Sequence, residues 1–130
     1  MKQKLLLLLV LFAFGLNAQT IYVKQNATGT GDGSSWANAY TSLDVALTAA
    51  ASSTTASIWV AAGTYKSASA AAEYSFLLTS GNSMYGGFAG TETALNQRNI
   101  AANPTILSGD ILGDDTPGNF TANRTDNAKH

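Results

Sequence analysis

The apolar residues form one long run near the start of the chain and several short clusters after it. Residues 5–16 are apolar apart from Gly15, follow Lys2 and Lys4, and are followed by Asn17 and Ala18. A positive start, an apolar segment and a small residue at the exit are typical of a secretory signal peptide. The run is shorter than the roughly 20 residues that a membrane-spanning helix needs. We therefore predict a signal peptide over residues 1–18, with the mature chain beginning at Gln19.

Residues 41–51 have the spacing of a single short amphipathic helix. Thr41 lies three residues before Asp44, which is the spacing of a capping box with Asp in place of the usual Glu. The polar segment 52–57 is expected to end the helix. One face repeats at i, i+3, i+4 and i+7 and consists of Leu43, Ala46, Leu47 and Ala50.

The other apolar clusters are short and are separated by glycine or asparagine, which is typical of short strands. None is followed by a hairpin dipeptide such as Asn-Gly. Short strands with sharp, irregularly spaced turns favour a parallel β-helix, in which the helix at 41–51 would cap the first rung. The strands are expected at residues 21–23, 58–60, 74–79, 83–85 and 104–108.

The loops between these elements offer two further expectations. Trp36 follows the glycine-rich segment 29–33 and is expected to pin that loop to the core. The segment lacks the lysine of a phosphate-binding P-loop, which argues against a nucleotide site. Glu92 and Arg98 are placed to form a local ion pair that fixes the loop after Gly90.

An ordered set of motifs spans most of the chain after the leader. They are residues 21–23 (Ile-Tyr-Val), 33–36 (Gly-Ser-Ser-Trp), 58–65 (Ile-Trp-Val-Ala-Ala-Gly-Thr-Tyr), 85–92 (Tyr-Gly-Gly-Phe-Ala-Gly-Thr-Glu), 97–99 (Gln-Arg-Asn) and 105–110 (Thr-Ile-Leu-Ser-Gly-Asp). The set resembles the N-terminal region of bacterial surface proteins of the pectin-lyase-like superfamily. It is especially similar to long Bacteroidetes-type proteins and to polymorphic outer-membrane proteins.

This resemblance implies an all-β fold, a right-handed parallel β-helix. Residues 19–57 would supply the N-terminal strand, the glycine-rich loop and the capping helix. Residues 58–130 would supply the first rungs, truncated at the C-terminus. Members of the family are usually much longer, so further rungs or an anchoring domain are expected to be missing from this chain.

Charge and cysteine content exclude several classes of function. The leader takes two of the seven basic residues with it, so acidic residues outnumber basic ones in the remainder. No basic patch is then left to bind nucleic acid or an anionic membrane. The chain has no cysteine, which excludes thiol nucleophiles and disulfides, so the fold depends on burial and hydrogen bonding.

Three carboxylates around a glycine-containing loop are the main chemical candidates. Asp110, Asp114 and Asp115 can supply oxygen ligands to calcium. A carboxylate pair can also act as acid and base in glycoside hydrolysis. The third interpretation is a solvated turn, since Asp, Gly, Pro and Asn are turn formers. Asp32 in the first glycine-rich loop has the same alternatives, and His130, at the chain end, is a poor general base.

The sequence favours an exported protein, secreted or held at the outer membrane and cell surface, that acts as a structural stalk or an adhesion and glycan-contact module without catalysis. Its partner would be a polysaccharide or a cell-surface glycan, and no helix of the mature chain is expected to cross a membrane. The alternative is the N-terminal part of a polysaccharide lyase or glycoside hydrolase whose active site lies on later rungs. Aromatic residues either stack on sugar rings or fill the core; they are Trp36, Trp59, Tyr65, Tyr74, Phe76, Tyr85 and Phe88.

Overall fold

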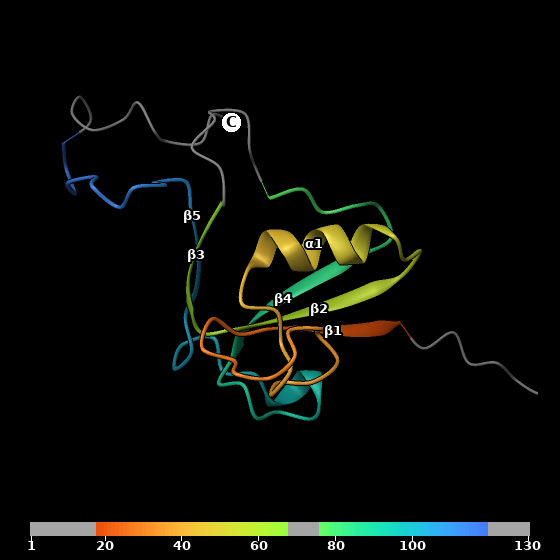
Figure 1. Cartoon of the computed structure of the whole chain (residues 1–130). Coiled ribbons are helices and arrows are strands. Elements are labelled where there is room, and N and C mark those ends of the chain that lie inside the picture. The colour runs from red at the N-terminus through yellow and green to blue at the C-terminus, as the bar shows by residue number, and fades with distance from the viewer. Residues whose placement is uncertain (1–17, 68–75, 120–130) are drawn as a thin grey trace, which may run out of the picture.

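The computed structural model describes residues 18–67 and 76–119 (Figure 1). The predicted signal peptide therefore lies outside the described residues except for Ala18. Within them, no helix combines the length and apolar character that crossing a membrane would require. The elements in chain order are β1 (Gln19–Val23), α1 (Leu43–Ala51), β2 (Ala56–Ala61), β3 (Gly63–Lys66), β4 (Ser83–Phe88), the 3₁₀ helix η1 (Leu95–Gln97) and β5 (Thr105–Ser108).

The strands form two small parallel sheets. The first has the order β1-β2-β4, and the second pairs β3 with β5. Ile21 lies opposite Ile58, and Ile58 opposite Met84, so the three strands of the first sheet run in the same direction and in register at this point. The chain passes directly from β2 into β3 through Ala62, which joins the two sheets at a corner.

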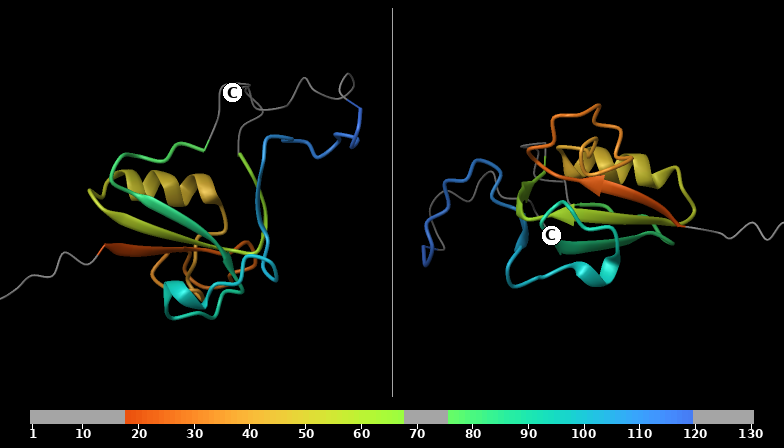
Figure 2. Two further views of the ribbon diagram at one scale, coloured as in Figure 1. Left: turned by 180° about the vertical axis from the view of Figure 1, so that it is seen from behind. Right: turned by 90° about the horizontal axis from the view of Figure 1, so that it is seen from below.

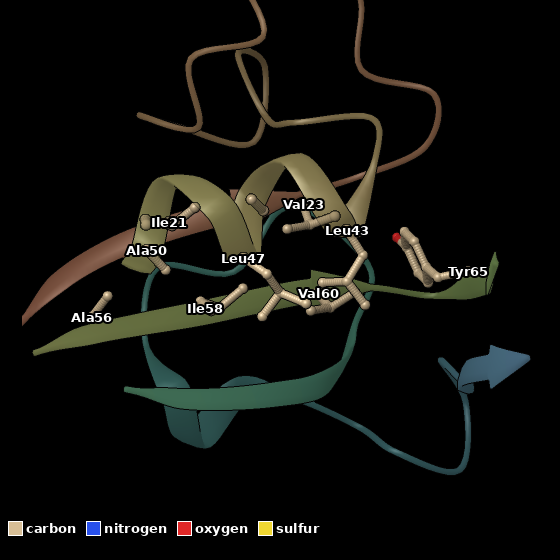
Figure 3. Packing of buried hydrophobic residues seen from close by; sticks show 10 residues of the cluster. Ile21, Val23, Leu43, Leu47, Ala50, Ala56, Ile58, Val60 and Tyr65 are labelled. Carbon is tan, nitrogen blue, oxygen red and sulfur yellow. The ribbon is translucent and has the colours of Figure 1, made fainter. Parts of the chain in front are cut away.

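The main core lies between α1 and the first sheet (Figure 3). Helix α1 connects β1 to β2 and packs against both strands. Its predicted apolar face is confirmed, since all four of its members are buried. These side chains meet the alternate residues of β1 and β2 that point toward the helix, namely Ile21, Val23, Ile58 and Val60. Parallel strands bridged by a covering helix satisfy the apolar surface of both elements.

The predicted parallel β-helix is wrong. The described residues form a small mixed fold of one α-helix, one short 3₁₀ helix, a three-stranded sheet and a two-stranded sheet, and they contain no closed solenoid. The physical reason is the position of α1, which lies over the face of the first sheet where the remaining strands of a rung would close (Figures 1 and 3). The helix buries the core side chains itself instead of shielding the end of a stack.

Several element boundaries also differ from the expectation. Helix α1 begins at Leu43 with Ser42 as its N-cap, and no side chain caps it, so the predicted capping box of Thr41 and Asp44 is wrong. Residues 76–79 are not in a strand, and residues 74 and 75 lie outside the described part. Strand β3 (Gly63–Lys66) lies where the sequence predicted no strand, and it forms because its backbone pairs with β5 across the corner.

Candidate functional site

The face of the first sheet turned away from α1 carries two rows of side chains in register. Thr20, Ser57 and Ser83 pair across β1, β2 and β4 and form a row of hydroxyls. Two residues further along each strand, Tyr22, Trp59 and Tyr85 form a parallel row of aromatic rings. Alternate residues of a strand point to opposite faces, and the residues between these six point toward the helix. We call this surface, formed by Thr20, Tyr22, Ser57, Trp59, Ser83 and Tyr85, the aromatic face.

A closed aromatic cluster anchors one end of this face. Trp59 stacks on Phe88 with ring centroids 4.8 Å apart, and the Trp36 ring lies 5.5 Å from Phe88. Tyr22 contacts both tryptophans edge-on, at 4.8 Å from Trp36 and 5.7 Å from Trp59. Phe88 is completely buried and Trp59 is only 7% exposed. Offset and edge-on ring pairs stabilise such clusters, so the four rings make a second core on the sheet side opposite α1.

A bulge in β4 brings Phe88 into this cluster. Trp59 lies opposite Tyr85, but Ala61 lies opposite Phe88, so β4 contains one residue more than β2 over this interval. Gly87 absorbs the bulge with a φ of 91°, a left-handed conformation that favours glycine. Any Cβ at Gly87 would also lie 2.9 Å from the Ile100 side chain. The bulge places Tyr85 and Phe88 on the same side of the sheet.

Two loops close the cluster from below (Figure 1). They are residues 24–40 and 89–104, and both gather beneath the carboxyl ends of the strands in Figure 1 and in the left view of Figure 2. The predicted pinning role of Trp36 is confirmed, since its indole N–H donates to the Glu92 carbonyl oxygen at 2.8 Å and its ring packs in the cluster. One hydrogen bond thus joins the two loops.

Glu92 organises the second loop through its carboxylate. The two side-chain oxygens accept hydrogen bonds from the backbone N–H groups of Ala89, Gly90 and Thr91, at 2.7, 3.0 and 2.9 Å. Partial burial acts to raise the pKa of Glu92, but these N–H groups outweigh it and hold the pKa below its usual value. The predicted pairing with Arg98 is replaced by these backbone contacts.

Arg98 instead lies against the aromatic face. Its guanidinium carbon is 5.3 Å from the centre of the Tyr85 ring, which is the geometry of a cation–π contact. Both side chains are half-buried, and Ser83 beside them is exposed. Tyr22, Ser57 and Thr20 are also only half-buried. The amino-terminal half of the face therefore offers a tyrosine ring, a guanidinium group and a row of hydroxyls to solvent.

At the predicted calcium site, the carboxylate of Asp110 binds backbone N–H groups of the following turn. One carboxylate oxygen of Asp110 accepts hydrogen bonds from the N–H groups of Gly113 and Asp114, at 2.6 and 3.2 Å. The other accepts a bond from the N–H of Asp115 at 3.4 Å. Within residues 18–67 and 76–119, no group of three acidic or histidine side chains is placed to hold a metal ion. Calcium binding at Asp110, Asp114 and Asp115 stays a prediction, while the observed bonds show that Asp110 shapes the turn.

Asp32 has a similar local role in the first loop. Its carboxylate accepts hydrogen bonds from the Ser34 N–H and the Thr30 hydroxyl, both at 2.9 Å. The contacts from Ser34, followed by that from Thr30, lower the pKa of Asp32. His130 lies outside the described residues.

The structure divides the predicted aromatic residues into two groups. Trp36, Trp59 and Phe88 belong to the closed cluster, Tyr65 is buried in the main core, and Phe76 packs against that core. Tyr74 lies outside the described residues. Of the candidates that are described, Tyr85 alone combines partial exposure with a place on the aromatic face. Sequence patterns alone do not identify Tyr22 or the hydroxyl row, because only strand register brings Thr20, Ser57 and Ser83 side by side.

Comparison of the chain with models of protein families, with curated proteins and with solved structures gave no match. The resemblance to pectin-lyase-like surface proteins therefore stays a prediction.

Proposed function

We propose that this chain is an exported, non-catalytic module that binds glycans through its aromatic face. The observation that carries the proposal is the alignment of a partly exposed tyrosine with a row of three hydroxyls, one on each strand of a single sheet. The leader-like pattern of residues 1–18 supports export, and an exported protein encounters polysaccharides and surface glycans.

The chemistry of a sugar fits this combination of groups. A pyranose has an apolar C–H face and a rim of hydroxyls. The Tyr85 ring provides a flat apolar platform for the C–H face. Ser57, Ser83 and Thr20 provide groups that both donate and accept hydrogen bonds for the rim. Arg98 lies over one face of the Tyr85 ring and adds five N–H donors in a fixed geometry, so the sugar would stack on the opposite face of the ring.

The rigidity of the face supports binding. Trp59, which lies beside Tyr85 in the row of rings, is held in place by its stack on Phe88. Its indole N–H donates to the Ser57 hydroxyl at 2.9 Å. That bond fixes the orientation of Ser57 in the hydroxyl row. Side chains held by packing and by hydrogen bonds lose little conformational entropy when a ligand binds.

Affinity electrophoresis in gels that contain soluble neutral or uronic-acid polysaccharides tests the proposal. We expect at least one polysaccharide to retard the wild-type chain, and Tyr85→Ala to weaken that binding at least tenfold. Tyr85→Phe keeps the ring and should bind within about twofold of wild type. Val45→Ala, on the exposed side of α1, is the matched control and should bind as wild type.

Two results would contradict the proposal. One is the absence of retardation by every polysaccharide in the panel. The other is binding by Tyr85→Ala at the wild-type level, with its far-UV circular dichroism unchanged. Either result would remove the aromatic face as a glycan-binding surface.

A further inference from the structure

The outer edge of the first sheet, at β1, is covered by a loop of the chain, whereas the outer edge of the second sheet, at β5, has no strand partner within the described residues. The edge of β1 is closed by the chain itself: the Tyr22 N–H donates to the Gly33 carbonyl at 3.0 Å, and the Tyr40 N–H donates to the Tyr22 carbonyl at 2.9 Å. The Lys24 N–H donates to the Tyr40 carbonyl at 2.9 Å, which extends this closure past the strand end. Strand β5, by contrast, has β3 as its single neighbour within the described residues.

The part of β4 nearest to β5 is also occupied. The carbonyl of Gly87 accepts a hydrogen bond from the Asn99 N–H at 2.7 Å, and the Gly87 N–H donates to the Thr105 hydroxyl at 3.1 Å. These contacts occupy the carboxyl end of β4, whereas β5 keeps one side without a strand partner within the described residues. The right view of Figure 2 shows the chain after β4 looping past the sheet before it reaches β5.

The orientation of the β5 backbone follows from one hydrogen bond. The Gly63 N–H donates to the Pro104 carbonyl at 3.1 Å, so the Pro104 carbonyl points toward β3. Successive residues of a strand point their backbone groups to alternate sides. Ile106 therefore pairs toward β3, whereas the N–H and C=O groups of Thr105 and Leu107 point to the open edge.

The side chains of β5 suit pairing with the β5 strand of a second, identical chain. Ile106 is 51% exposed and Leu107 is 44% exposed. The strand contains no charged residue, and its sequence is Thr-Ile-Leu-Ser. Natural edge strands usually carry charges or other features that block pairing with further chains. Two copies of this uncharged edge can approach without like-charge repulsion.

We propose that β5 pairs antiparallel with β5 of a second copy of this chain across a two-fold axis centred on Ile106. A two-fold axis requires antiparallel strands. This register places Thr105 of each copy opposite Leu107 of the other copy. The outward N–H and C=O groups of these two residue pairs exchange four hydrogen bonds. Ile106 then lies opposite its own copy, in a non-hydrogen-bonded pair where side chains are closest. The contact is short, so the dimer forms in a concentration-dependent equilibrium.

Cysteine cross-linking on the full chain tests this register, because the natural sequence contains no cysteine. Opposite Cα atoms in a non-hydrogen-bonded pair are about 4.5 Å apart, which is within the range that a disulfide bridges. Under mild oxidation we expect Ile106→Cys to form a covalent dimer in more than half of the chains. Thr64→Cys is the matched control, since Thr64 is exposed on β3 directly opposite Ile106 within one chain but away from the open edge. It should cross-link at least fivefold less.

A charge pair gives a second, independent test. Ile106→Lys and Ile106→Glu should each be monomeric in sedimentation equilibrium at concentrations where the wild type dimerises. A mixture of the two variants should restore the dimer. Equal cross-linking at Ile106→Cys and Thr64→Cys would overturn the proposal. So would a wild-type chain that stays monomeric at every concentration, which would leave the edge to a partner other than a second copy.

Discussion

Trp59 and Phe88 stack with their ring planes 9° from parallel, although the two residues lie on different strands, β2 and β4, with β3 between them in the chain. The stack depends on the bulge at Gly86 and Gly87, which shifts the register of β4 by one residue. It joins the floor of the aromatic face to the loop that Glu92 organises. The stack is therefore the main structural support of the candidate binding surface.

Removal of the Phe88 ring should strongly destabilise the protein. Phe88→Ala leaves a cavity between two tryptophans, and truncations of this kind cost about 3–5 kcal/mol in the free energy of unfolding. Phe88→Leu fills most of the space and should cost less. Urea denaturation followed by tryptophan fluorescence measures both values. A loss below about 1 kcal/mol for Phe88→Ala would contradict the cluster.

Asn82 should contribute to stability through both ends of its amide. Its Oδ1 accepts the Ala56 N–H at 2.8 Å, and its Nδ2 donates to the Ala50 carbonyl at 2.9 Å, so it joins the end of α1 to the start of β2. Asn82→Ala should cost about 1–3 kcal/mol, because partly buried backbone groups lose their partners. Asn96→Ala, at an exposed position of η1, serves as the control in thermal unfolding. Equal melting temperatures for the two variants would refute the role of Asn82.

Acid should weaken the loop that Glu92 holds. The pKa of Glu92 is lowered in the folded state, so its contribution is present above the ordinary value of 4.5 and is lost as the pH falls through the folded value. Glu92→Gln should therefore lower the melting temperature at pH values well above 4.5 and make little difference in acid, where Glu92 is already neutral. A difference between wild type and Glu92→Gln that does not change with pH would count against this interpretation.

Millimolar calcium should leave the melting temperature unchanged. The oxygens of Asp110 already accept three backbone hydrogen bonds, which give this carboxylate a structural role in the turn that needs no metal ion. Asp110→Ala should loosen the turn equally with and without calcium. A calcium-dependent rise in melting temperature that Asp110→Ala abolishes would instead establish the metal site predicted from the sequence.

The sequence predicted local elements more successfully than their arrangement. The spacing of Leu43, Ala46, Leu47 and Ala50 identified the buried face of α1, because a helical stripe is a property of one segment. The same short apolar strands fit either a solenoid or a sheet covered by a helix, since both bury alternate residues. The position of α1 over Ile58 and Val60 decides between them, and no local pattern encodes it.

The candidate site was predictable only in part. Tyr85 and Trp59 were recognised as candidate sugar-stacking residues from their type alone. Their alignment with Tyr22, and the hydroxyl row beside them, depends on pairing between three segments that lie far apart in the chain. The capping box failed for a local reason, because Ser42 takes the N-cap position and shifts the helix start past Thr41.

The most direct test of the proposed function is a chemical-shift map of the chain during titration with an oligosaccharide from the polysaccharide that retards it most. The account predicts that the largest amide shifts cluster at Thr20, Ser57, Ser83, Tyr85 and Arg98, on the sheet side opposite α1. Shifts that cluster instead on the exposed side of α1, around Val45 and Thr48, would contradict it, and so would a titration that moves no amide of the described residues.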